Sequence, residues 1–333
     1  MPRRSRAITL NDVARESGYS RATVSRVVNG QANVDPVIAA AVQAAVSRTG
    51  YAVNTAARTL AGGASHNVGL VFAEGFRELF SNPYWGEVVE GLSGTLAEHG
   101  YRETFLVRDQ RSQLDVFLAQ RGLDAVVIMS PEPEDRIERE LRRLRIPTVV
   151  FGRAGSPQTS AAAIDEEAAG RIAAERFIDR DRTSPVVIAG RDDMQVSARR
   201  VAGFVAAFAD RGVTIEPQRI AHGEFTAPGG YRAMHALLSG KRAVDSVFAC
   251  SDRMALGALQ ALHERSLSIP DDIAVIGVDG TVLGEQAQPR LTSVGADLES
   301  IGRELGALTL EAIAGQAQRC IEFAPHLIER DSA

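Results

Sequence analysis

Residues 9–30 constrain the fold more than any other part of the chain, because they predict two short helices joined by a tight turn. Thr9 is expected to cap the first helix, with Asp12 three residues later as the acid of a capping box. Gly18 can adopt the left-handed conformation that ends a helix, and Ser20 can then cap a second helix. Two helices so closely connected are typical of a helix-turn-helix, whose second helix enters the major groove of DNA.

The second helix is expected to have one apolar and one polar face. Val24, Val27 and Val28 recur at helical spacing and form its buried stripe. A recognition helix also needs polar or cationic side chains near its N-terminus, where it reaches the edges of the bases. The exposed side meets this need with Arg21, Ala22, Ser25 and Arg26.

A third helix is predicted over residues 35–49, with Asp35 as its cap and Gly50 after its end. Three such helices would also fit an ordinary helical bundle. Charge favours DNA binding, because residues 1–66 hold eight arginines against three acids, a net charge of about +5. The whole chain has a net charge of −5, so the remaining residues carry about −10. A basic segment on an acidic body suits contact with phosphates.

The N-terminal residues resemble the lac repressor family of bacterial transcription regulators. The resemblance is carried by Thr-Val-Ser-Arg-Val-Val-Asn at residues 23–29, by Gly50-Tyr51 and by residues 54–61. It implies that the first three helices bind the major groove and that a hinge helix within residues 54–63 enters the minor groove at the operator centre. Arg21, Ala22 and Arg26 are then the expected base-reading positions.

Leu60 occupies the position of a leucine that, in this family, levers a base step open. An apolar wedge of this kind partly unstacks the bases and kinks the duplex. From the residues alone, Leu60 could equally be a linker leucine anchored on the body. The residues predicted to contact DNA are Thr9, Ser20, Arg21, Ala22, Thr23, Ser25, Arg26, Asn29, Asn54, Ala57, Arg58 and Leu60.

The chain departs from the family in its third helix, where Ile38-Ala39 stand in place of the Thr-Arg of many members. Whether that helix contacts phosphates therefore stays open. Arg3, Arg4 and Arg6 are the candidates to replace part of them.

From residue 67 onward, short apolar runs alternate with longer helical stretches, as expected for parallel sheets covered on both faces. This pattern predicts an α/β body of two doubly wound lobes behind the all-helical N-terminal region. Helices are expected over residues 87–99, 135–143, 166–179, 196–210, 230–238, 253–265 and 298–313. Strands are expected over residues 68–72, 104–107, 125–129, 148–151, 185–189, 246–250, 273–278 and 319–323.

The resemblance extends over essentially the whole chain and implies a body similar to periplasmic sugar-binding proteins. In such proteins the chain crosses between two lobes and the ligand lies in the cleft. The crossings would fall near residues 164–165, near residues 291–294 and near the C-terminal strand. The predicted domains are a DNA-binding domain over residues 1–53, a hinge and linker over residues 54–66, and an effector-binding and dimerisation domain over residues 67–333.

Several polar and aromatic residues follow the predicted strands, where ligands bind in open parallel sheets. An arginine and an aspartate that face one ligand can bind vicinal hydroxyl groups, and Arg199 and Asp279 are expected to form such a pair. By the resemblance, the effector pocket is lined by Tyr84, Trp85, Ser130, Arg199, Phe225, Ser251 and Asp279.

Other interpretations of these residues stay open. Arg199 is followed by Arg200, so one of the two is expected to be a solvated surface charge. Asp252 is expected to cap the following helix and not to touch the ligand. Tyr84 and Phe225 would also suit the core or the interface between the lobes, and Asp279 would suit a turn.

Two positions depart from the sugar-responsive members of the family. Ser251 stands where asparagine is frequent, and Gly152 stands where aspartate is frequent. Both changes remove hydrogen-bonding groups for hydroxyls. The pocket is then either more apolar or receives the charge of Arg153.

Composition limits the compartment and the chemistry. No apolar stretch is long enough to span a membrane, and no apolar run follows the basic start, so the cytoplasm is expected. The two cysteines, Cys250 and Cys320, are expected to be buried thiols. The sequence has no phosphate-binding glycine motif, nucleophile elbow or metal-ligand cluster, so neither catalysis nor a cofactor is expected.

The leading hypothesis is a homodimeric transcription regulator, most simply a repressor. Two N-terminal domains would bind the halves of a near-palindromic operator, and a small effector such as a sugar would change the affinity for DNA. A solute-binding protein of a transporter is the alternative, but it leaves the basic N-terminal segment unexplained. An enzyme on this α/β body is a third possibility, for which no catalytic residues can be identified.

Overall fold

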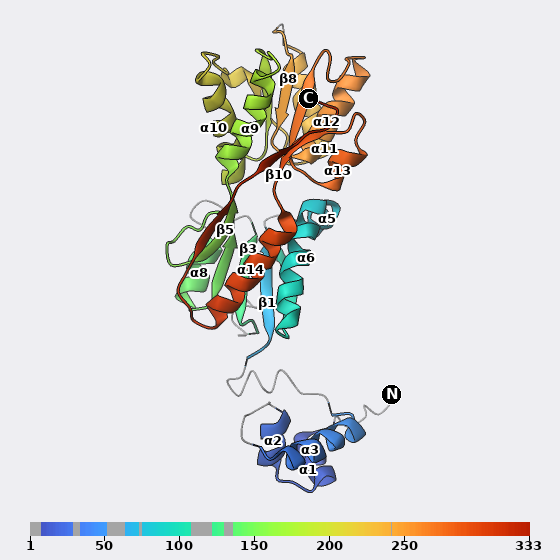
Figure 1. Cartoon of the computed structure of the whole chain (residues 1–333), viewed down its shortest axis with the longest axis vertical. Coiled ribbons are helices and arrows are strands. Elements are labelled where there is room, and N and C mark those ends of the chain that lie inside the picture. The colour runs from blue at the N-terminus through green and yellow to red at the C-terminus, as the bar shows by residue number, and fades with distance from the viewer. Residues whose placement is uncertain are drawn as a thin grey trace. The chain divides into compact units, whose positions relative to one another are not determined.

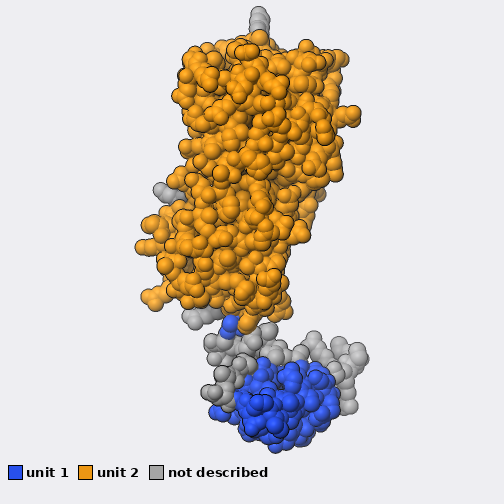
Figure 2. Space-filling view, viewed as in Figure 1, with its two compact units in different colours: residues 1–65 blue, residues 66–333 orange. Residues whose placement is uncertain are grey.

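The computed structural model describes residues 8–28, 34–51, 64–72, 75–107, 122–129, 136–240 and 242–333. The chain divides into two compact units, residues 1–65 and residues 66–333 (Figure 2). The predicted hinge helix within residues 54–63, with Asn54, Ala57, Arg58 and Leu60, lies outside the described residues. The same holds for Arg3, Arg4, Arg6, Asn29 and Ser130.

The first unit is a three-helix domain whose helix ends are set by the expected residues. The Thr9 backbone N–H donates to Asp12 Oδ2 over 2.9 Å, and the Val37 N–H donates to Asp35 Oδ1 over 2.7 Å. Gly18, with a φ of 76°, ends the first helix in the left-handed conformation that glycine favours. The helices are α1 (Leu10–Ser17), α2 (Arg21–Val28) and α3 (Pro36–Thr49).

The core of this domain is small. Val13, Val24, Val42 and Ala45 are fully buried, and Tyr51 packs against them. Each helix contributes to this cluster, so the three helices hold one another in place.

The second unit consists of two lobes, each built on a six-stranded sheet (Figure 1). The first five strands of each lobe follow the same order, β2-β1-β3-β4-β5 and β7-β6-β8-β9-β10, so the two lobes share one topology. In lobe 1 the strands are β1 (Asn67–Phe72), β2 (Arg102–Val107), β3 (Ala125–Met129), β4 (Thr148–Phe151), β5 (Ser160–Ile164) and β11 (Cys320–Phe323). In lobe 2 they are β6 (Pro185–Ala189), β7 (Ile220–His222), β8 (Ser246–Ala249), β9 (Ala274–Asp279), β10 (Thr292–Gly295) and β12 (His326–Ile328).

Among the described strands, all neighbours pair in parallel except β12, which runs antiparallel to β10. Helices cover both sheets, as continuous apolar strands require. Lobe 1 carries α5 (Phe76–Ser81), α6 (Pro83–Glu98), α8 (Arg136–Arg143) and α14 (Leu298–Ile313). Lobe 2 carries α9 (Glu166–Ile178), α10 (Gln195–Ala209), α11 (Ala227–Leu238), α12 (Asp252–Glu264) and α13 (Val282–Gln286), with the short 3-10 helix η1 (Pro217–Arg219).

Three helix pairs pack through glycines that leave no room for a side chain. A Cβ on Gly302 of α14 would lie 2.1 Å from the Val88 carbonyl oxygen of α6. A Cβ on Gly203 of α10 would lie 2.0 Å from the Glu167 carbonyl oxygen of α9. Gly257 of α12 makes an equally close approach to α11. These crossings fix how the helices sit on the sheets.

The chain passes between the lobes three times (Figure 1). It leaves lobe 1 between β5 and α9, returns between β10 and α14, and leaves again between β11 and β12. The second crossing comes just after the residues expected for it, because residues 292–295 belong to β10 of lobe 2. The expected α/β body of two parallel-sheet lobes is confirmed.

Two further findings concern single expectations. Cys250 is buried, but Cys320 is exposed, so the expectation of two buried thiols is wrong for Cys320, which lies on the edge strand β11. Within the described residues, no helix is long and apolar enough to cross a membrane.

Candidate functional site

A cavity of about 460 Å³ lies where the strand ends of lobe 2 meet the start of α6 from lobe 1. We call it the arginine–aspartate cavity. It receives polar groups from α9, α10 and β9 and aromatic groups from α6, so both lobes contribute to it. Its lining residues are Asn82, Tyr84, Trp85, Glu166, Met194, Val196, Arg200, Phe225, Ser251, Arg253 and Asp279.

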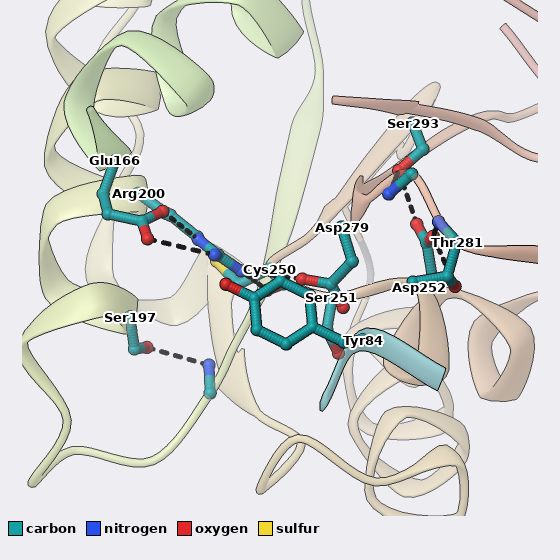
Figure 3. A network of polar contacts seen from close by, with 12 residues as sticks. Tyr84, Glu166, Ser197, Arg200, Cys250, Ser251, Asp252, Asp279, Thr281 and Ser293 are labelled. Atoms are coloured by element: carbon teal, nitrogen blue, oxygen red, sulfur yellow. Dashed lines mark hydrogen bonds and ion pairs between the residues drawn. The ribbon is translucent and has the colours of Figure 1, made fainter. Parts of the chain in front are cut away.

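Arg200 is the centre of the polar contacts in this cavity (Figure 3). Its Nε donates to Glu166 Oε2 over 2.5 Å and its Nη2 to Glu166 Oε1 over 3.2 Å, a two-pronged pair. Its Nη1 donates to the Cys250 carbonyl oxygen over 2.7 Å and to Asp279 Oδ1 over 3.4 Å. The Arg200 side chain is 5% exposed, so these contacts replace its hydration.

Burial and neighbouring charges set the protonation of this group. Burial acts to lower the pKa of Arg200, but the Glu166 and Asp279 carboxylates outweigh it and raise that pKa, so the guanidinium stays charged. Burial raises the pKa of Asp279 well above its usual range, and the Asp252 and Glu166 carboxylates add to this effect while Arg200 opposes it. Arg200 is therefore shared by two carboxyl groups, and burial disfavours the charged form of Asp279.

Asp252 forms hydrogen bonds that hold the loop after Asp279 in place behind the cavity. It is fully buried and accepts hydrogen bonds from Ser293 Oγ over 2.5 Å and from the Thr281 backbone N–H over 2.9 Å (Figure 3). Burial raises the pKa of Asp252 to about 6, although the hydrogen bonds from Ser293 and Thr281 act against that shift. Asp252 holds the chain that follows Asp279, and so helps to position Asp279.

The expected helix cap is a different residue. Ser251 is the N-cap of α12 and its Oγ accepts a hydrogen bond from the Met254 N–H over 3.2 Å, whereas Asp252 is the first residue of the helix. The expectation that Asp252 caps α12 is therefore wrong. Ser251 has both roles in the structure, because it caps the helix and lines the arginine–aspartate cavity.

Aromatic side chains form another part of the wall. Tyr84 and Trp85 open α6, and their ring centres lie 5.1 Å apart at a nearly right angle. Phe225 has a φ of 56°, a left-handed conformation that is strained for a non-glycine residue. Its ring lies against Gly190, where an added Cβ would come within 2.1 Å of it. Aromatic faces of this kind can hold the apolar face of a sugar or a planar ring.

The predicted pair of Arg199 and Asp279 is replaced by a pair of Arg200 and Asp279. Successive residues of a helix point about 100° apart, so only one of two adjacent arginines can face the cavity. Arg199 Nε instead donates to Glu167 Oε1 over 3.1 Å, and its Nη2 lies 3.8 Å from Asp165 Oδ1.

Arg199 lines a second cavity of about 460 Å³, which we call the Arg153 cavity. It shares Tyr84, Glu166 and Val196 with the arginine–aspartate cavity, so the two adjoin. Its lining residues are Tyr84, Phe151, Gly152, Arg153, Ala163, Ile164, Glu166, Gln195, Val196 and Arg199.

The structure thus gathers Tyr84, Trp85, Phe225, Ser251 and Asp279 around one cavity and places Arg199 in the next. Sequence reasoning missed Glu166, Arg200 and Arg253. Glu166 opens a helix directly after a strand end, a signal that could have identified it. Arg253 spans the lobes, because its Nη2 donates to Ser81 Oγ of α5 over 3.4 Å.

In the first unit, the predicted DNA-contacting residues lie on and before α2. Arg21, Ala22 and Arg26 are exposed, whereas Val24 on the opposite face is fully buried. Ser20 caps α2 by accepting the Thr23 N–H over 3.1 Å, and Thr9 is held in the capping box of α1. Thr23 and Ser25 are partly buried.

No group of His, Cys, Asp and Glu side chains in the described part of the chain could hold a metal ion.

Comparison with known proteins gives two domain matches. Residues 9–54 match the family described as bacterial regulatory proteins, lacI family. Residues 174–333 match the periplasmic binding protein-like domain.

Among full-length relatives, the HTH-type transcriptional regulator CelR of Thermobifida fusca is 35% identical, over 99% of this chain and 99% of the relative. Catabolite control protein A of Priestia megaterium is 30% identical, over 97% of this chain and 98% of the relative.

Two solved structures resemble the whole chain. A transcriptional regulator CelR–cellobiose complex has a TM-score of 0.78 and 33% identity, with 98% of this chain and 100% of that chain covered. The lac repressor dimer bound to operator and the anti-inducer ONPF has a TM-score of 0.85 and 23% identity, covering 98% of this chain and 99% of that chain; at this identity it shows the fold alone.

Proposed function

The chain belongs to the lacI family of bacterial regulatory proteins, and we propose that it is a homodimeric repressor whose affinity for a near-palindromic operator is controlled by a sugar. The chain is a DNA-binding transcription regulator and not an enzyme, as its relatives are named regulators. The dimer, the repressor role, the operator form and the effector are our proposals. A cytoplasmic location follows from them, because the protein must reach DNA.

The exposed face of α2 supports the proposed contact with DNA. Arg21 and Arg26 are exposed cations that could each reach guanine or a phosphate, and Ala22 can contact a thymine methyl group. Two copies related by a twofold axis would bind two half-sites in opposite orientations. We further propose that residues 1–53 form the DNA-binding domain and residues 67–333 the effector and dimerisation domain.

The single observation that carries the effector proposal is the Arg200–Asp279 pair in a cavity with aromatic walls. Arg200 donates hydrogen bonds and Asp279 accepts them, so the two can bind neighbouring hydroxyls of one ring. Tyr84, Trp85 and Phe225 can cover the apolar face of that ring. Cellobiose is the ligand named for a relative of similar fold, which makes a sugar the natural class to test.

The effector would act through the arrangement of the lobes. The arginine–aspartate cavity takes residues from both lobes, and the Arg253–Ser81 hydrogen bond joins the lobes at its edge. A ligand that favours one arrangement over the other shifts the balance between them by its difference in affinity. Linkage then requires the effector and the operator to change each other's affinity by the same factor.

Selection of binding sites from a randomised DNA library tests the DNA-binding part. We expect full-length protein to enrich a sequence with two symmetric halves. A chain that shows no sequence preference in gel shifts, with or without sugars, would contradict the proposal. A stand-alone solute-binding protein would give that result and would still bind a sugar.

Leu60→Ala tests the proposed minor-groove wedge. It should weaken binding to the selected operator by about 10-fold or more. Unstacking a base step costs a few kcal/mol, and without the leucine wedge no inserted side chain offsets that cost. Binding to random duplex should change little in the same gel shifts. Equal losses on both DNAs would argue against a wedge.

A further inference from the structure

Two cavities adjoin at the junction of the lobes. Each includes about 460 Å³ of space, part of which is open to solvent. They share the lining residues Tyr84, Glu166 and Val196, so the Arg153 cavity lies directly beside the arginine–aspartate cavity. A ligand of two linked units would use both.

The Arg153 cavity has a cationic side. Arg153 is exposed, and within the described residues its guanidinium makes no hydrogen bond or ion pair. The preceding residue is Gly152, with a φ of 122°, so no side chain at that position competes for the guanidinium. Arg199 adds a second guanidinium, whose partner Glu167 has a side chain 57% exposed to water. Arg199 itself is 17% exposed and its Nη2 lies 3.8 Å from Asp165 Oδ1, so an anion in the cavity would share this guanidinium with two carboxylates.

The start of α10 adds to the positive potential. Gln195 is the first residue of this 15-residue helix and lines the cavity together with Val196. Met194 at the N-cap supplies no side-chain hydrogen bond to the first turn. The positive end of the helix dipole therefore acts together with the two guanidinium groups.

We propose that the Arg153 cavity is a second effector subsite that binds an anionic group, so that the effector is an acidic disaccharide. The hydroxyls of one unit bind Arg200 and Asp279, and a carboxylate or phosphate of the second unit binds Arg153. The apolar walls of the Arg153 cavity, Phe151 and Ile164, contact the second ring. This inference rests on the proposed function and specifies the class of its effector.

Matched neutral and acidic disaccharides test the proposal on the full-length protein. Isothermal titration calorimetry would compare cellobiose with cellobiouronate, which differs by one carboxylate, and with cellobiose phosphate. The acidic ligands should bind about 10-fold more tightly than cellobiose, since a charged hydrogen bond is worth at least that factor. The stronger of the two acidic ligands identifies the group. Equal affinity for all three ligands, or binding of cellobiose alone, would overturn the proposal.

Variants assign the preference to the cavity. Arg153→Ala should bring the affinity for the acidic ligands down to the affinity of the same variant for cellobiose, whereas Arg153→Lys should keep most of the preference for the acidic ligands at low salt. Arg142→Ala, an exposed arginine of α8 outside both cavities, is the matched control and should change nothing. A preference that survives Arg153→Ala would contradict the assignment.

Operator binding separates this inference from the proposed function. If cellobiose and cellobiouronate bind equally and both change operator affinity, the second subsite fails and the regulator stands. If the acidic ligand binds through Arg153 but operator affinity stays the same, the subsite stands and the proposed control of DNA binding fails.

Discussion

Arg200 pairs with two buried carboxyl groups, Glu166 and Asp279, and this imbalance of charge shapes both stability and binding. Glu166 holds the guanidinium from two sides, while Asp279 makes a longer contact of 3.4 Å and keeps capacity to accept from a ligand. Asp279 can therefore accept a hydrogen bond from a ligand hydroxyl while the pair of Arg200 and Glu166 stays intact. The site is organised before the ligand arrives.

Arg200→Met should destabilise the second unit strongly. It leaves Glu166 and Asp279 buried without their cation, and breaking a buried pair in this way costs about 3–5 kcal/mol. Chemical denaturation at pH 7 would measure the free energy of unfolding. The matched control is Arg199→Met. Because the partner of Arg199, Glu167, is mostly exposed, this variant should lose less than about 1 kcal/mol of the free energy of unfolding. Equal losses for the two variants would contradict the account of the cluster.

Asp252→Asn should change how stability depends on pH. The pKa of Asp252 is raised to about 6 in the folded state, so the folded protein binds a proton at Asp252 more tightly than the unfolded chain does. The stability that this proton contributes is lost as pH rises from about 4 to above 6. The variant lacks this loss, so its stability relative to wild type should rise by about 3 kcal/mol over that window.

Asp297→Asn is the control of opposite sign for this experiment. Hydrogen bonds from Ser300 lower the pKa of Asp297, so wild type gains stability from this carboxylate as pH rises to about 4, and the variant should fall behind over that range. Denaturation at about pH 3, 4.5 and 7 would measure both variants, with the effect of Asp297 expected between the first two values and most of the effect of Asp252 between the last two. A stability difference between Asp252→Asn and wild type that does not change with pH would contradict the raised pKa.

Among the helices and strands, those with strong apolar runs were predicted best. The strands over residues 125–129, 148–151 and 185–189 have the predicted bounds, because each is a short and almost wholly buried run bounded by polar residues, proline or glycine. The strands β5, β7, β10 and β12 were missed. They are short or rich in Ala, Ser and Thr, and their conformation depends on pairing with distant strands.

The candidate site was predicted less completely, for a reason of the same kind. The strand ends identified the region, since all parallel strands of a lobe finish at one edge. The choice between Arg199 and Arg200 depends on the rotation of α10. That rotation is fixed by the contact of Gly203 with the Glu167 backbone of α9, which lies more than thirty residues away in the sequence. No local pattern carries this information.

Gly302→Ala should disrupt the crossing of α6 and α14. The new Cβ would lie 2.1 Å from the Val88 carbonyl oxygen, a backbone atom that cannot move without shifting the helix. Overpacking of this kind costs about 1–3 kcal/mol or more. Gly94→Ala is the matched control on α6, where an added Cβ meets nothing within 4 Å, and it should stabilise by about 0.5–1 kcal/mol. Thermal unfolding of both variants would measure this, and a destabilised Gly94→Ala with an unaffected Gly302→Ala would contradict the packing.

On the scale of the whole molecule, one topology is used twice and joined by three crossings. Few covalent connections and a cavity built from both lobes suit a body whose lobes can take more than one arrangement. The family resemblance identified this architecture from the sequence. It did not identify the Arg253–Ser81 contact between the lobes. Neither residue belongs to a motif, and the two come together only in the folded chain.

The most direct test of the account is the operator affinity of full-length protein with and without its sugar, measured by fluorescence anisotropy for wild type and Asp279→Asn. In wild type the sugar should change the dissociation constant for the selected operator by about 5-fold to 150-fold, and the operator should change sugar affinity by the same factor. In Asp279→Asn the sugar should leave operator affinity unchanged, while affinity without sugar stays that of wild type. An undiminished effect of the sugar on operator affinity in this variant would contradict the claim that the arginine–aspartate cavity controls the affinity for DNA.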